Sequence, residues 1–132
     1  MKFLLDTHIL LWSMWGSNKL PNKMKEAIEK NGNELWLSPV SAWEILVLAE
    51  KGRIEVPGKR PEVWVKNILK SVPVKVAPLN WEVAIKSRQV KLTHEDPADR
   101  FIVATALIYN LILLTMDQKI LDSGCSEFCF KI

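Results

Sequence analysis

The sequence predicts an α/β fold, a three-layer sandwich with helices on both faces of a mostly parallel, five-stranded sheet. Two continuous apolar runs, residues 3–5 and 111–116, each lead into an aspartate, Asp6 and Asp117. An unbroken apolar run is typical of a strand that is buried on both faces, as in parallel sheets covered by helices. Between these runs, short strand-like segments alternate with helical patterns, and this alternation favours a parallel sheet.

The elements expected along the chain are separated by recognisable start and stop signals. Ser38 and Asp96 are each followed by a proline, which is the pattern of an N-cap and a first helical position, and Asn80 is a third N-cap. Gly16 and Gly52 end helices, and prolines around the third strand make it short and place it at an edge. Strands are expected at residues 2–6, 34–37, 74–79, 111–116 and 128–132, and helices at 9–15, 21–30, 38–51, 61–70, 80–90, 96–109 and 117–121.

Composition is that of an ordinary globular chain, with 132 residues that predict one domain, 1–132. The apolar fraction is 48% and the charged fraction 25%. A net charge of +3 permits contact with nucleic acid but does not argue for it alone. If the carboxylates gather at one site, however, the remaining surface is more basic than this total.

Two apolar segments resemble a targeting or membrane segment, but neither is interpreted as one. Residues 1–15 begin like a signal peptide, but Asp6 interrupts the apolar stretch and no cleavage site follows. Residues 101–116 are too short for a membrane span. The expected localisation is therefore cytoplasmic, without membrane association, and Cys125 and Cys129 are expected to be reduced structural residues. The two histidines are too few and too scattered for a zinc site.

Four carboxylates stand at positions that the predicted fold brings together. Asp6 and Asp117 follow the first and fourth strands, Glu44 lies two turns into the helix after the second strand, and Asp99 lies in the first turn of a buried helix. All four can point into one crevice if strand order reverses between the first and fourth strands. Two charges 4 Å apart repel by roughly 4 kcal/mol at an effective dielectric of 20, and a divalent cation removes that conflict.

Oxygen ligands select Mg²⁺, with Mn²⁺ as a plausible substitute, over Zn²⁺. Such a site suits hydrolysis of a phosphodiester, because a bound metal makes hydroxide available near neutral pH and stabilises charge on the phosphate. No protein nucleophile is then required, and the sequence contains no Ser-His-Asp or Cys-His arrangement.

Each of these residues also has a purely structural interpretation. Asp6 and Asp117 can be N-caps of the helices that follow them, and Asp99 can interact favourably with the dipole of its own helix. Asp96 is interpreted as a cap rather than a ligand. Glu44 could belong to a capping box, but a helix start at Ser38 leaves it without a capping role.

Three further polar residues are candidate supporting groups. Thr115 leaves its strand on the same side as Asp117 and could orient it or a metal-bound water, although a buried strand threonine is the commoner case. Thr7 and Asp96 are the other two. Among the six tryptophans, most are expected in the core and one or two at a partner interface.

The pattern as a whole resembles the PIN domain, and within that family the VapC-type toxins of bacterial and archaeal toxin–antitoxin pairs. The matching segments are residues 4–8, 38–44, 96–102 with Ala104 and Ala106, and 114–117. The resemblance implies an Mg²⁺-dependent ribonuclease that acts on RNA through Asp6, Glu44, Asp99 and Asp117. It also implies strand order 3-2-1-4-5, a homodimer, and a small antitoxin whose tail occupies the site. The fourth acidic position varies in this family, so Asp96 could share the role of Asp117.

Other functions fit the sequence less well. A phosphatase of the haloacid dehalogenase type requires a second aspartate two residues after the first, where this chain has His8. A receiver domain requires an acidic pair near the end of its first strand, where this chain has Asp6 alone. Two alternatives within the fold stay open: a catalytically silent PIN-fold binding module, and a general RNA-processing nuclease outside a toxin–antitoxin pair.

Overall fold

Four parallel strands form the central sheet of the computed structural model, which describes residues 1–58, 60–92, 95–124 and 126–131. Their order across the sheet is β3-β2-β1-β4. In the centre of the sheet, Leu4 pairs with Trp36 on one side and with Leu113 on the other. The strands are β1 (Lys2–Leu5), β2 (Glu34–Leu37), β3 (Val74–Val76) and β4 (Ile112–Leu114).

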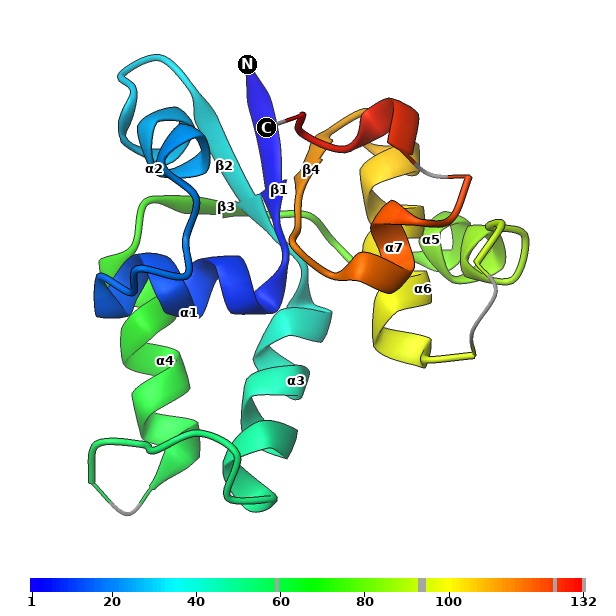
Figure 1. Cartoon of the computed structure of the whole chain (residues 1–132). Coiled ribbons are helices and arrows are strands. Elements are labelled where there is room, and N and C mark those ends of the chain that lie inside the picture. Colours follow the sequence, from blue (N-terminus) through cyan, green and yellow to red (C-terminus); the bar gives the residue numbers. More distant parts are fainter. Residues whose placement is uncertain (59, 93–94, 125, 132) are drawn as a thin grey trace.

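Helices cover both faces of this sheet, as Figure 1 shows. They are α1 (Thr7–Trp15), α2 (Asn22–Glu29), α3 (Pro39–Glu50), α4 (Pro61–Ser71), α5 (Trp81–Ser87), α6 (Pro97–Ile108) and α7 (Gln118–Leu121), with a 3-10 helix η1 (Ser126–Phe128). Alternate residues of β1 enter two separate cores. Phe3 and Leu5 pack in the core formed with α1 to α4, whereas Leu4 packs in the core formed with α5 and α6. The predicted three-layer α/β arrangement around a parallel sheet is thus observed.

The fifth strand was expected at residues 128–132, and the described part of that range, 128–131, does not form a strand. The chain curls into η1 as far as Phe128, which leaves only a short stretch to pair with the sheet edge. One parallel bridge joins Cys129 to Leu113, and the Phe130 N–H donates to the Leu113 carbonyl over 2.9 Å. The segment therefore lies beside β4, where the order 3-2-1-4-5 requires it, but as a bridge and not as a strand. Cys125 and Ile132 lie outside the described residues.

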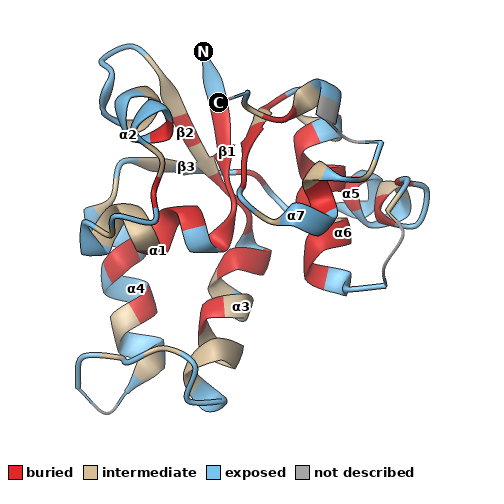
Figure 2. Ribbon diagram, in the orientation of Figure 1, coloured by how far each residue is buried: buried red, intermediate tan, exposed pale blue. Residues whose placement is uncertain are grey.

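The predicted helix starts are confirmed by their caps. The Ser38 hydroxyl accepts a hydrogen bond from the Val40 N–H, and the Asn80 side chain accepts one from the Val83 N–H. The helix α6 is buried over most of its surface, as its nearly continuous apolar sequence predicts (Figure 2). None of the described helices is long and apolar enough to cross a membrane.

A buried arginine fixes the connection between α5 and α6. Arg100 donates to the carbonyl of Ser87 over 2.9 Å, to that of Val90 over 3.2 Å and to that of Leu92 over 3.5 Å. Guanidinium nitrogens form a rigid fork of donors, so these bonds hold the loop against the first turn of α6. That turn carries Asp99, so these bonds fix its position relative to α5 and the residues that follow α5.

Candidate active site

The Asp6 carboxylate lies at the carboxyl end of β1 and is only 7% exposed. One oxygen, Oδ1, accepts a hydrogen bond from the Thr7 N–H over 2.8 Å and so caps α1. The other, Oδ2, accepts from the Thr115 hydroxyl over 2.6 Å. Asp6 is therefore an N-cap, as the structural interpretation expected, and at the same time it is bonded to the segment that follows β4.

Thr115 joins the ends of β1 and β4. Its hydroxyl donates to Asp6 and accepts from the Asp117 N–H over 3.0 Å. The bond to the Asp117 N–H is consistent with the supporting role considered for Thr115 in the sequence, and the bond to the Asp6 carboxylate is a contact that the sequence did not indicate. The Asp117 carboxylate itself caps α7, because its Oδ1 accepts from the N–H groups of Lys119 and Ile120.

Thr7 connects the first strand end to α3. Its side chain is fully buried, and its Oγ1 lies 3.0 Å from the Oγ of Ser41, which is equally buried. The Thr7 hydroxyl also forms a hydrogen bond with Glu44 that lowers the pKa of that carboxyl. Thr7 is the donor in the bond to Ser41, and because a hydroxyl has one proton, Ser41 and Glu44 are alternative acceptors of that proton. Ser41 thus supports Thr7 from α3, a role that the sequence did not suggest.

Asp96 and Asp99 stand at the start of α6. Asp96 is the N-cap, and its Oδ1 accepts from the Ala98 N–H over 3.0 Å and from the Asp99 N–H over 3.4 Å. The structure thus confirms the cap expected for Asp96. Asp99 follows in the first turn and is buried.

Burial dominates the electrostatics of the two central acids. It raises the pKa of Asp6, against the lowering effect of the bonds from Thr115 and Thr7 and of the charge of His8. The charge of Asp117 raises the pKa of Asp6 further. Burial also raises the pKa of Glu44, and the charges of Asp6 and Asp96 add to this effect.

The structure therefore brings Asp6 within electrostatic reach of Glu44 and Asp117, and Glu44 within reach of Asp96. Among the described residues, neither Asp6 nor Glu44 forms an ion pair with a lysine or arginine. In the same part of the chain no three His, Cys, Asp or Glu side chains are close enough to enclose a metal ion. Magnesium is usually bound by one or two carboxylates while it keeps several waters, and the buried Asp6 carboxylate with the partly buried Glu44 and Asp117 near it fits that mode.

A pocket of about 200 Å³ opens beside these acids. It is lined by Asp6, His8, Trp12, Met116 and Asp117. The sequence had singled out only the two aspartates. The signal for His8 and Trp12 was their spacing, because residues four apart share one side of a helix and Asp6 caps the helix that carries them.

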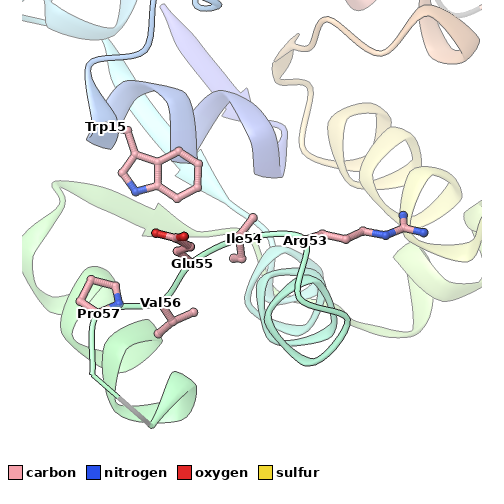
Figure 3. A pocket seen from close by; sticks show the side chains of 6 residues that line it. All are labelled: Trp15, Arg53, Ile54, Glu55, Val56 and Pro57. Carbon is pink, nitrogen blue, oxygen red and sulfur yellow. The ribbon is translucent and has the colours of Figure 1, made fainter.

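A larger pocket of about 530 Å³ lies at the other end of α1 (Figure 3). Trp15 and residues 53–57, from the connection between α3 and α4, line it. In Figure 3 the Trp15 indole lies over the connection, while the Arg53 side chain points away from the indole. None of the predicted site residues lines this pocket, whereas Asp6 and Asp117 line the smaller one.

Fold and site together define a member of the PIN domain family: the family model matches residues 3–123, and the chain belongs to that family. The chain is similar to the ribonuclease VapC22 of Mycobacterium tuberculosis (strain ATCC 25618 / H37Rv), with 29% identity over 120 residues, 89% of this chain and 88% of that protein.

Solved structures share the fold. VapBC2 from Rickettsia felis, bound to a DNA fragment from its promoter, has a TM-score of 0.63 and 17% identity, and 95% of each chain is covered. A toxin–antitoxin complex from Klebsiella pneumoniae has a TM-score of 0.61 and 23% identity, and 90% of this chain and 89% of that chain are covered.

The buried Asp6 carboxylate predicts a pH dependence of stability. Its pKa is raised in the folded protein from an ordinary 3.8, so the folded state holds the proton more tightly than the unfolded chain. The free energy of unfolding therefore falls as the pH rises from the unfolded pKa through the folded one. Asp6→Asn removes this penalty, and in EDTA the variant should lose less stability than the parent between about pH 4 and about pH 7.

Urea denaturation at a series of pH values measures this difference. The matched control is Asp122→Asn, which removes an exposed carboxylate of the segment after β4 that accepts a hydrogen bond from Gln118. The control should follow the pH profile of the parent. If Asp6→Asn has the same profile as the parent, burial does not perturb Asp6 as described.

The cap at Asp96 predicts the effect of a second substitution. Asp96→Ala removes the acceptor of two backbone N–H groups and should lower the free energy of unfolding by about 1 kcal/mol. Asp96→Ser retains an acceptor and should restore most of that loss. Equal destabilisation by both substitutions in urea denaturation would show that Asp96 acts through something other than its cap.

Proposed function

We propose that this protein is a ribonuclease that hydrolyses RNA phosphodiester bonds with a bound Mg²⁺, or Mn²⁺ in its place, and that it is the toxin of a toxin–antitoxin pair. The observation that carries the proposal is the buried Asp6 carboxylate, which meets the charges of Glu44 and Asp117 without an ion pair to lysine or arginine among the described residues. Membership of the PIN family and the similarity to a protein named as a ribonuclease support it.

The residues proposed for the cation site are Asp6, Glu44, Asp99 and Asp117, with Asp96 as the alternative to Asp117; one or two of these carboxylates would bind the cation directly, and the others would bind it through its waters. When bound, the metal would lower the pKa of a water and stabilise charge on the phosphate. The chain's own contribution is to fix the oxygens. Thr115 and the Thr7 N–H each hold one oxygen of Asp6, and the Thr7 hydroxyl holds Glu44. Ligands held in this way do not need to reorganise when the substrate arrives.

Metal-dependent cleavage of RNA tests the nuclease proposal. Purified protein should cleave single-stranded or structured RNA with Mg²⁺ or Mn²⁺ and stop when EDTA is added, and Asp6→Asn should reduce the rate by about 100-fold or more. Cation binding should also raise the melting temperature of the parent, because a ligand at ten times its Kd stabilises the folded state by about 1.4 kcal/mol. Asp6→Asn should lose most of this shift, and Asp122→Asn should keep both the shift and the activity.

Several outcomes would contradict the proposal. Cleavage that persists in EDTA would show that the reaction does not require a metal ion. If cation binding raises the melting temperature of Asp6→Asn as much as that of the parent, Asp6 is not a ligand of the cation. Loss of activity in Asp96→Ser, with unchanged stability, would not contradict the nuclease proposal but would give the fourth acidic position to Asp96 in place of Asp117. A metal-dependent thermal shift without cleavage of any RNA favours the alternative, a catalytically silent binding module.

The proposed partner is a small antitoxin protein. Its support is that the similar folds from Rickettsia felis and Klebsiella pneumoniae were solved as a VapBC pair and a toxin–antitoxin complex. A short neighbouring gene for a DNA-binding protein, whose product co-purifies with this chain and inhibits cleavage, is the expected finding. Cleavage activity with no such gene favours a general RNA-processing nuclease.

The proposed homodimer would use the exposed face of α5. Trp81 is 87% exposed and Ile85, one turn later, is 60% exposed. Contiguous exposed apolar side chains are typical of interaction surfaces, and these two lie one turn apart on the same helix. Glu82 and Lys86 flank them, so a two-fold axis across α5 sets the glutamate of one copy against the lysine of the other. This charge pattern is self-complementary, which is what an isologous interface requires.

The double substitution Trp81→Ser and Ile85→Ser should therefore convert the protein to a monomer, with the dimer dissociation constant raised by about tenfold or more. Sedimentation analysis measures this change. Trp15→Ser, which removes an exposed tryptophan of α1, should leave the association unchanged. A parent that is already monomeric, or a double variant that still dimerises, would contradict the use of this face.

A further inference from the structure

Two aromatic residues stand beside the acids in the smaller pocket. His8 and Trp12 lie one turn apart on α1, with ring centroids 6.0 Å apart and planes inclined by 53°. Both line the pocket together with Asp6 and Asp117. Trp12 is half-buried and packs against the core under α1, so its indole is held in place. His8 is exposed. The pocket thus has an acidic side and an aromatic side.

The size and chemistry of this pocket limit what it can hold. Its volume of about 200 Å³ is below the roughly 300–1,000 Å³ usual for small-molecule sites, which leaves room for one ring system. Met116 adds a polarisable, partly exposed wall. Unpaired bases stack on Trp and His side chains in RNA complexes, and such stacking tolerates any base because every base has a π face.

We propose that His8 and Trp12 form a stacking site for one unpaired nucleobase of the RNA strand, beside the phosphate that the acidic residues receive. This inference rests on the proposed function, since it takes the acidic side of the pocket as the place of the phosphate. The site selects single-stranded RNA, because a paired base in a duplex does not present its face. It contributes affinity and positions the strand, and it does not discriminate between the four bases.

The test measures RNA binding by fluorescence anisotropy at one fixed salt concentration. All variants are made in a Glu44→Gln background, so that the strand stays intact and Asp6 is unchanged. The probes are a labelled single-stranded RNA of mixed sequence and a ribose-phosphate chain of the same length without bases. His8→Ala should weaken binding of the RNA by about fivefold or more and leave binding of the chain without bases unchanged.

Further variants separate stacking from charge and from folding. His8→Phe retains a ring without charge and should bind RNA within about twofold of the background, whereas His8→Lys retains charge without a ring and should not. Trp12→Leu should weaken RNA binding at least as much as His8→Ala. Trp12 also packs in the core, so this variant could be unstable; in that case the test depends on the variants of the exposed His8. Trp15→Ala removes an exposed tryptophan from the other pocket and should have no effect.

Three results would overturn the stacking site. One is equal weakening of both probes by His8→Ala, the second is rescue by His8→Lys but not by His8→Phe, and the third is weakened binding of a protein partner with RNA binding unchanged. The two proposals fail separately. If the parent cleaves RNA and His8→Ala changes neither the Kd nor the KM for RNA, the stacking proposal is wrong and the nuclease proposal is retained. If RNA binding depends on His8 but the parent cleaves no RNA, the nuclease proposal is wrong and the stacking proposal is retained.

Discussion

The hydrogen bond of 2.6 Å between the Thr115 hydroxyl and the Asp6 carboxylate connects residues 109 positions apart in the sequence. Around it, the Asp6 N–H donates to the Leu114 carbonyl, and the other carboxylate oxygen caps α1. The ends of β1 and β4 and the start of α1 are therefore fixed by one residue. A neutral apolar replacement would leave the Thr7 N–H and the Thr115 hydroxyl without their acceptor in a buried place, which costs about 1–3 kcal/mol for each group. Fold and candidate site depend on the same carboxylate.

That carboxylate is also a source of instability, because burial raises its pKa and no lysine or arginine pairs with it among the described residues. Proteins that keep such a group usually do so at a functional site, where stability is given up for activity. Glu44 shows the same conflict in milder form, since it is less buried and feels the charges of Asp6 and Asp96. A proton or a cation would relieve both acids. The proposed function differs from a purely structural interpretation in requiring the cation.

Local signals in the sequence were sufficient for much of the fold but not for its contacts. Helix starts at Ser38 and Asp96 depend on a cap and the proline after it, so they could be predicted from neighbouring residues. The partner of Thr115 depends on which strands are adjacent, and the failed fifth strand depends on a 3-10 turn that periodicity does not show. The sequence left a cap and a site role open for Asp6, and the structure shows the cap. A cap occupies part of one oxygen's bonding capacity, so the two roles are compatible.

The same reasoning bears on how a phosphate could approach this edge of the sheet. Helix N-termini attract anions because their first N–H groups lack partners. Here the helices α1, α6 and α7 are capped by the carboxylates of Asp6, Asp96 and Asp117, and α3 is capped by the Ser38 hydroxyl. Each cap accepts from only one or two of the first N–H groups, but three of these four caps are carboxylates, and their charge repels an incoming phosphate. In the proposed function, a cation between the two sets of oxygens would offset that repulsion.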